Sequence, residues 1–345
     1  MKKERLVYFD IIKFIAVICV FTVHFTRTLE YFLNFDFKIL PDRIFGVYLG
    51  GFGVTLFFIT SGASLMYVYD EKLDLKTYIK KRFSGIFPMF WLTYFIAFLV
   101  NFYINKGFDQ TIPKYRILAT LIGFDGLDAF YHPNFYLLGE WFLGVIISLY
   151  ILFPLLRILV MKFPWISFAM VIIVHIILVQ NYSPASALPL ECVVFARLVE
   201  FMFGMLFIRY IKKVNIFMFV PALAIMIVAE FVDLTKINNM YVIPVVGISS
   251  FIVFTFLFCR IKKGIFKQIS IFISKYSYAI FLTHHYIMLV FIKHFMGTLQ
   301  PASGIIVLYT TLVCIVIMAS MIMVKLDKAV SKTISNALFS KEKIK

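Results

Sequence analysis

The chain has 345 residues, of which 62% are hydrophobic and only 15% are charged, and its formal net charge is +16. This composition excludes a soluble domain of the same length, and apolar runs recur along nearly the whole chain, which is typical of a polytopic α-helical membrane protein. The four cysteines all fall inside apolar runs and form no CxxC pair. The sequence therefore indicates neither a disulfide framework nor a metal site.

About ten stretches of roughly 20 residues are predicted to cross the membrane as helices. The expected spans are 10–30, 47–69, 85–104, 137–160, 165–180, 191–210, 214–232, 241–259, 270–294 and 303–324. The segment 117–123 is too short to span and is expected to be re-entrant or interfacial. The basic N-terminus leads into a run without a small-residue cleavage site, so we interpret that run as a retained first helix and not as a signal peptide.

The distribution of positive charge predicts that both termini are cytoplasmic. On that topology, 23 lysines and arginines fall in cytoplasmic segments and 8 in external segments, as the positive-inside rule requires. The basic excess thus reflects topology, with attraction to anionic lipids as a secondary effect, and does not call for nucleic acid as a partner. We interpret residues 1–345 as one integral-membrane domain with a basic cytoplasmic tail at 325–345. The longest external connection, 105–136, is either a cover over an outward-facing cleft or a solvated loop.

The first predicted span carries two ionisable side chains, Lys13 and His24, inside an otherwise apolar run. Eleven residues correspond to three helical turns plus roughly 20° and a rise of about 16 Å, so both side chains lie on one face. An ionisable residue at membrane depth is costly and usually faces a bundle interior or a wet cavity. The spacing therefore predicts that this face of the helix lines a cavity.

Six short motifs follow one another along the chain. They fall in the segments Asp10–His24, Gly53–Gly62, Lys80–Trp91, Trp141–Pro154, Ala196–Met205 and Ser274–His285. In this order the motifs resemble those of the acyltransferase 3 family, integral-membrane enzymes that O-acylate sugars and other cell-envelope acceptors. The first motif is similar to the family's D-x-x-R-x10-H pattern, and the resemblance extends from Tyr8 to about Val324.

Two positions depart from the family pattern. Lys13 stands where arginine is usual, which keeps the charge but loses the planar fork that grips phosphate. Ile146 stands five residues after Trp141, where many members carry glutamate, and Glu140 is a possible substitute. The second departure points away from the O-antigen-modifying branch and toward proteins described as exporters or modifiers of surface polysaccharide.

The resemblance implies an enzyme in the plasma membrane that moves an acyl group, expected to be acetyl, from cytoplasmic acyl-CoA to a hydroxyl of an extracytoplasmic glycan. No bound cofactor is expected, and relay of acyl groups to a distant polymer would need a separate partner protein. Acyl transfer needs a base, donors for the oxyanion and positioned substrates, here within the bilayer. The alternative is a transporter or exporter of surface polysaccharide or lipid-linked sugar. Inverted repeats and paired broken helices would favour transport, and neither is evident in the sequence.

The first two motifs supply the main candidates. His24 is the expected catalytic base, because the pKa of imidazole lies near working pH, and the alternative is a structural histidine bonded to a neighbouring helix. Lys13 is expected to attract the donor's phosphates as a point charge or to reach the lipid headgroups. Asp10 either pairs with Lys13 or caps the helix. Ser61 and Gly62 are expected to allow close helix packing.

Other histidines and one glutamate are candidates with weaker support. His284 is expected to orient His24 or to stabilise the oxyanion, with a structural role as the alternative. His285 points about 100° away from His284 on the same helix and is expected to be structural. Glu140 is expected to position His24, and His175 to be a hydrogen-bonded core group.

The remaining candidates are basic or polar residues for substrate binding. Arg197 can pair with Glu200 three residues later, or it can bind an acyl carbonyl or the acceptor. Lys81 and Arg82 fit the phosphates of CoA, although positive-inside topology alone also accounts for them. Tyr150 lies in the fourth motif and is assigned to substrate binding by the resemblance.

Overall fold

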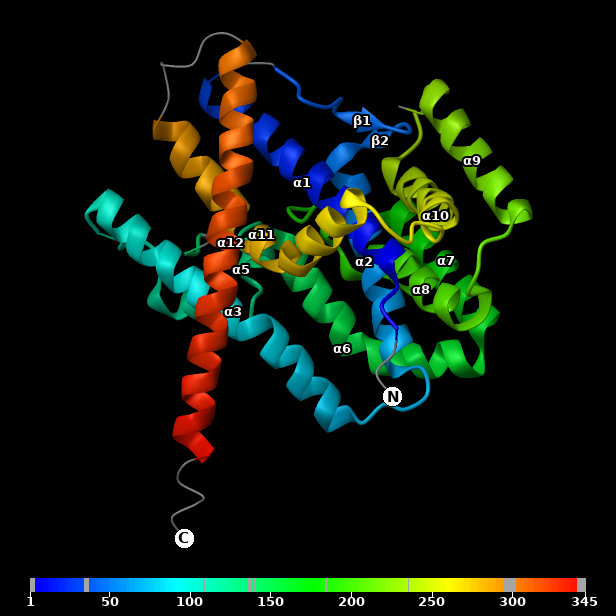
Figure 1. Cartoon of the computed structure of the whole chain (residues 1–345), viewed down its shortest axis with the longest axis horizontal. Helices are drawn as coiled ribbons and strands as arrows, with labels where there is room; N and C mark the ends of the chain where they lie inside the picture. Colours follow the sequence, from blue (N-terminus) through cyan, green and yellow to red (C-terminus); the bar gives the residue numbers. More distant parts are fainter. Residues whose placement is uncertain are drawn as a thin grey trace. The chain divides into compact units, whose positions relative to one another are not determined.

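The computed structural model describes residues 4–33, 37–107, 109–135, 138, 140–183, 185–234, 236–294 and 302–339. Nearly all of this chain is helical (Figure 1), and the strands are two short segments that pair antiparallel, β1 (Arg43–Ile44) and β2 (Val47–Tyr48). The prediction of an all-α polytopic membrane protein is confirmed.

Most of the expected spans lie largely within a helix of the structure. They are α1 (Val7–Leu33), α2 (Leu49–Tyr69), α3 (Leu75–Asn105), α4 (Ile117–Leu121), α5 (Asp125–Asp128), α6 (Glu140–Lys162), α7 (Pro164–Asn181), α8 (Leu198–Leu206), α9 (Ile216–Phe231), α10 (Asn239–Phe258), α11 (Ile265–His294) and α12 (Ala302–Phe339). Short 3-10 segments lie at η1 (Lys114–Arg116), η2 (Leu190–Cys192) and η3 (Val194–Arg197), and a π-helical turn at η4 (Phe207–Ile211).

Among the described residues, seven helices are long and apolar enough to cross a membrane, namely α1, α2, α3, α6, α7, α10 and α12. In α1 the candidate span covers residues 7–32, and in α12 it covers residues 303–330. Of the other three expected spans, 214–232 is the 16-residue helix α9, 270–294 lies in α11, and 191–210 is divided among η2, η3, α8 and η4. The short segment 117–123 forms only the five-residue α4. The count of ten spans and the cytoplasmic termini stay predictions.

The chain divides into two compact units. Unit 1 contains Met1–Arg27, Lys38–Leu75 and Trp141–Lys275. Unit 2 contains Thr28–Phe37, Lys76–Glu140 and Tyr276–Lys345. Each unit is described by itself below, and the single-domain interpretation stays a prediction.

Glycines bring the central helices of unit 1 into close contact. A Cβ added at Gly62 of α2 would collide with the backbone carbonyl of Phe201 in α8, and one added at Gly204 of α8 would collide with the carbonyl of Ile59. Gly247 of α10 faces α2 with equally little space. Small residues of this kind let membrane helices approach backbone to backbone, so the packing role expected for Gly62 is confirmed.

Side chains cap several helices of unit 1 by hydrogen bonding to backbone groups at the helix ends. The side chains of Asn215 and Asn238 accept hydrogen bonds from backbone N–H groups in the first turns of α9 and α10, both at 3.0 Å. At the C-terminal end of α2, the side chain of Arg157 donates to the carbonyls of Tyr69 and Asp70 at 2.6 and 2.9 Å. These contacts satisfy backbone groups that a helix end leaves without intrahelical partners.

In unit 2, part of the external connection is folded against α3. Trp91 Nε1 donates to the carbonyl of Leu121 at 2.9 Å, and the hydroxyl of Tyr94 donates to the carbonyl of Phe135. Thr120 and Asp125 are buried. The described part of this connection is therefore a packed structure and not only a solvated loop.

Asp125 is a buried carboxylate within this connection, with a relative exposure of 1%. It accepts hydrogen bonds from the backbone N–H of Gly126 at 3.1 Å and from the hydroxyl of Thr120 at 3.4 Å. Burial raises the pKa of Asp125 to about 7, although these hydrogen bonds oppose the shift. Asp125 is thus a carboxylate outside the predicted spans that responds to neutral pH.

The last two helices of unit 2 are long and continuous. Thr283 of α11 and Ser320 of α12 lie 3.2 Å apart through their hydroxyl oxygens. α12 runs as one helix of 38 residues (Figure 1), so the tail expected from residue 325 continues the helix as far as Phe339.

Candidate functional site

The structure places Lys13 and His24 in one uninterrupted helix, α1, as the sequence predicts. Both side chains are half-buried, and each is preceded along α1 by a buried residue. Three helical turns therefore separate an ammonium near the start of the helix from an imidazole nearer its end. Their functional roles stay predictions.

At the start of α1, Asp10 has partners that the sequence did not indicate. Arg5 Nε and Nη2 donate to the two carboxylate oxygens at 2.7 and 2.8 Å, and the hydroxyl of Ser274 in α11 donates to Oδ1 at 2.7 Å. Asp10 is 6% exposed. The sequence suggested a pair with Lys13 or a helix cap, whereas the structure shows Asp10 joining the N-terminal segment and α11 to α1.

In unit 2, Glu140 pairs with His285. His285 Nδ1 lies 3.2 Å from Glu140 Oε1, and the side chains are 43% and 13% exposed, respectively. The pair joins the first residue of α6 to α11. The sequence expected His285 to be structural and Glu140 to position His24, and it gave no reason to connect Glu140 with His285.

The backbone of Glu140 is in the left-handed region, with a φ of 39°. For a residue with a Cβ this conformation costs roughly 1–2 kcal/mol, because the Cβ approaches the following carbonyl oxygen. Backbone outliers of this kind concentrate at functional sites, where the surroundings hold them in place. The strain therefore marks Glu140 as a residue whose side-chain position is fixed by more than helix formation.

His284 has a different environment from its neighbour His285. It is 1% exposed, and its Nδ1 lies 2.9 Å from the carbonyl oxygens of both Ile280 and Phe281 in its own helix. Its ring is thus oriented by backbone carbonyls within α11. This geometry is what a structural histidine requires, which was the alternative that the sequence left open for His284.

Arg197 and Glu200 form a closed ion pair in unit 1. Arg197 Nη1 lies 3.0 Å from Glu200 Oε1, and the side chains are 1% and 0% exposed. Arg197 Nε also donates to the carbonyl of Glu191 at 2.9 Å, and the guanidinium carbon lies 5.6 and 5.8 Å from the ring centroids of Phe58 and Trp141. The predicted pairing on one helix face is confirmed, and Arg197 is packed as a structural residue.

The other candidates occupy separate places. Lys81 is exposed and Arg82 half-buried near the start of α3, and Tyr150 is half-buried in α6. His175 is 4% exposed and its Nε2 lies 2.7 Å from the carbonyl oxygen of Met240, so the expectation of a hydrogen-bonded core group is confirmed. Contact of Lys81, Arg82 or Tyr150 with a substrate stays a prediction.

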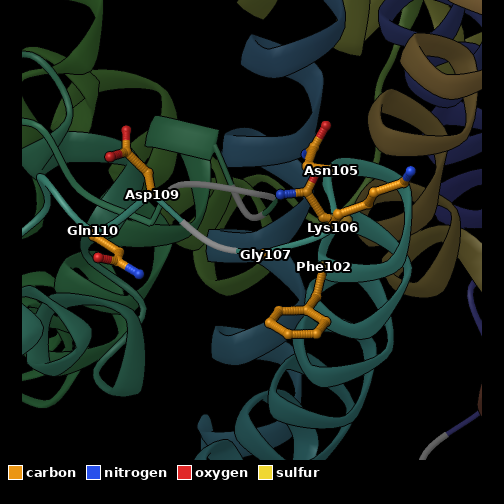
Figure 2. Close-up of a pocket in the computed structure, with 7 residues that line it drawn as sticks. Phe102, Asn105, Lys106, Gly107, Asp109 and Gln110 are labelled. Atoms are coloured by element: carbon orange, nitrogen blue, oxygen red, sulfur yellow. The ribbon is translucent and has the colours of Figure 1, made fainter.

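A separate hollow of about 730 Å³ lies at the end of α3 and contains none of these candidates. Figure 2 shows Asn105, Lys106 and Gly107 on one side of it and Asp109 and Gln110 on the other. The helix ends here because Lys106 takes the left-handed conformation, with a φ of 53°, and the N–H of Gly107 donates to the carbonyl of Phe102 at 3.0 Å. The hollow lies where the helix ends, and its described lining residues include no serine, threonine, cysteine or histidine.

The comparisons with known proteins identify the family. A family model described as an acyltransferase domain, that of the acyltransferase 3 family, matches residues 6–324. The protein is therefore a multi-pass membrane acyltransferase, and the chain belongs to the acyltransferase 3 family. Neither the curated proteins nor the solved structures that were compared gave a match.

The structure adds His285, Arg5 and Ser274 to the residues of interest. Sequence gave one signal for His285, namely that it follows His284 directly and that adjacent helical residues point about 100° apart. Which of the two faces a carboxylate depends on how α11 packs. Arg5 lies 5 residues from Asp10 in the sequence, and Ser274 lies 264 residues from it. Because Ser274 is so distant, no local sequence pattern indicates its contact with Asp10.

Proposed function

We propose that this acyltransferase moves an acyl group, acetyl in the simplest case, from cytoplasmic acyl-CoA to a hydroxyl of an extracytoplasmic glycan in the plasma membrane. The observation that carries the proposal is the family match over residues 6–324. The apolar helices and the positive-inside charge distribution support an enzyme whose two substrates arrive from opposite sides of a membrane. The glycan, the acyl donor and the particular membrane belong to the proposal.

The reaction requires a group that takes the proton of the acceptor hydroxyl while its oxygen attacks the thioester carbonyl. Among the histidines of the described spans, His24 and His285 are half-buried, whereas His175 and His284 are buried. We retain His24 as a proposed catalytic residue, because it is the half-buried imidazole on the helix that also carries Lys13. Lys13, Lys81 and Arg82 are proposed to attract the donor's phosphates.

The test is acetyl-CoA turnover by purified protein in liposomes, with cell-envelope glycan as acceptor and release of the CoA thiol as the signal. Wild type is compared with His24→Ala and with His132→Ala, a matched histidine variant in the external connection. The expected result is glycan-dependent turnover in wild type and in His132→Ala and none in His24→Ala. Equal turnover in wild type and His24→Ala would remove His24 from the catalytic machinery. Absence of glycan-dependent turnover in wild type would contradict the proposed function and favour export of a surface polysaccharide.

A further inference from the structure

The carboxylate of Glu140 lies beside the imidazole of His285, with 3.2 Å between Oε1 and Nδ1. We propose that His285, positioned by Glu140, accepts the proton of the acceptor hydroxyl in place of His24, whose part in the reaction is then to hold that hydroxyl. The inference rests on the proposed acyl transfer and names the group that performs one of its steps. It assigns a chemical role to a histidine that the sequence analysis had considered structural.

The position of Glu140 favours one tautomer of His285. His285 Nδ1 lies 3.2 Å from Glu140 Oε1, and a carboxylate at that position favours the tautomer with its proton on Nδ1. The lone pair of the neutral ring then lies on Nε2, which is the nitrogen that must accept a proton. A carboxylate behind an imidazole also stabilises the imidazolium that forms during the reaction.

The imidazole of His285 is accessible, whereas its carboxylate partner is largely covered. The side chain of His285 is 43% exposed and that of Glu140 13% exposed, so the ring is reachable while its carboxylate is largely covered. His284 is 1% exposed and its Nδ1 faces the carbonyls of its own helix. His285 thus combines an exposed ring with a carboxylate partner.

The backbone conformation of Glu140 also favours a functional role for its carboxylate. A φ of 39° at the first residue of α6 is a strained conformation for glutamate. Asparagine or glycine would adopt it at lower cost, so the local fold does not explain the choice of residue. A requirement for a carboxylate at the position facing His285 does explain it, and a helix N-terminus is a favourable place for an anion.

In the proposed reaction, His285 accepts one proton and returns it during acyl transfer. The acceptor oxygen attacks the thioester carbonyl carbon and a C–O bond forms, while the hydroxyl proton passes to Nε2 of His285. The C–S bond breaks, the CoA thiolate leaves, and the imidazolium returns the proton to sulfur. The products are the ester and CoA thiol, and His285 is neutral again.

The first experiment reads the pair without activity. Protein labelled with ¹⁵N-histidine in detergent micelles is compared as wild type, Glu140→Gln and His285→Gln, the last of which assigns the His285 signals. The expected result is an Nδ1–H tautomer for His285 in wild type and a changed ¹⁵N signature in Glu140→Gln. An Nε2–H tautomer, or a signature unaffected by Glu140→Gln, would overturn the inference even if acyl transfer is confirmed.

The second experiment reads the step itself, with acetyl-CoA and cell-envelope glycan as substrates. His285→Ala is expected to lose roughly 100-fold or more in kcat and to regain part of it with added imidazole, whereas His132→Ala keeps wild-type activity and does not respond. The double variant Glu140→Gln with His285→Ala is expected to be no slower than His285→Ala, because Glu140 acts through His285. Rescue of His24→Ala by imidazole without rescue of His285→Ala would overturn the inference and assign the proton to His24. If wild type shows no turnover, the proposed function fails and the ¹⁵N signature still decides whether the pair exists.

Discussion

Two side-chain pairs that each contain a glutamate, one pair in each unit, differ in how far they are closed to their surroundings. Arg197 and Glu200 lie three residues apart and are 1% and 0% exposed, and aromatic rings cover the guanidinium. Glu140 and His285 lie on different helices and keep 13% and 43% exposure. The first pair is closed on all sides, whereas the second leaves an imidazole accessible.

The difference teaches that burial, and not charge alone, separates a structural pair from a candidate for catalysis. A buried ion pair cannot contact a substrate. Removing one partner of such a pair leaves an uncompensated charge in a medium of low dielectric constant, which destabilises the protein. An open imidazole–carboxylate pair can exchange its proton with a substrate.

The largest effect is expected from opening the closed pair. Glu200→Gln leaves the Arg197 guanidinium buried without its carboxylate, which should cost about 3–5 kcal/mol of stability. Unfolding in detergent on addition of SDS measures the loss. Arg209→Gln is the control, because Arg209 pairs with Asp70 at 2.7 Å with both side chains partly exposed, and such pairs are worth about 1 kcal/mol or less. Similar losses in the two variants would contradict the distinction.

The second effect concerns the accessible imidazole in unit 1. His24→Ala should reduce kcat by roughly 10²–10⁴-fold, which is the usual contribution of a general base or of a comparable proton contact. Because His24 is half-buried, expression and membrane insertion should survive. Acetyl-CoA turnover and the yield of monodisperse protein are measured together. A variant that loses yield in proportion to activity would show that His24 is structural, like His175.

The third prediction uses Asp125, a buried carboxylate in the external connection. Its pKa is raised from 3.8 to about 7, so the folded protein binds a proton that the unfolded chain has lost between these values. Stability should therefore fall as pH rises from about 4 to about 7, by an amount on the order of a few kcal/mol, and level off above that. Asp125→Asn should abolish this slope. Thermal unfolding of both proteins between pH 5 and 8 is the measurement, and parallel curves would refute the assignment.

The smallest effect is expected at Lys13. Lys13→Arg keeps the charge and adds a planar fork, so activity should be retained, whereas Lys13→Ala should raise the KM for acetyl-CoA by roughly 10-fold through loss of one contact to a charged group. kcat at saturating donor should change little. A fall in kcat at constant KM would show that Lys13 acts on the transition state and not on donor binding.

The helices and one of these pairs could be predicted from sequence because the information is local. Apolar runs of about 20 residues gave the spans, and a spacing of three residues gave the pair of Arg197 and Glu200. The apolar run likewise placed Lys13 and His24 on one helix. Residue 137, the expected start of the fourth span, lies outside the described residues, so that start stays a prediction.

The contacts that the sequence did not predict join residues that are far apart in the chain. Glu140 and His285 are brought together by the packing of α11, and so are Asp10 and Ser274. A helical pattern shows that His284 and His285 point in different directions, but it does not show which direction meets a carboxylate. That choice depends on the rotation of a helix about its axis, which one sequence does not determine.

The glycines of unit 1 have a consequence for how this sequence can change over time. Gly62 and Gly204 each face the backbone of a neighbouring helix, so that even one added methyl group has no room. Gly85, inside α3, has no neighbouring atom within 4 Å of an added Cβ, and alanine there should favour the helix by about 1 kcal/mol. Random mutagenesis followed by selection for folded protein should therefore leave Gly62 and Gly204 unchanged while it freely replaces Gly85.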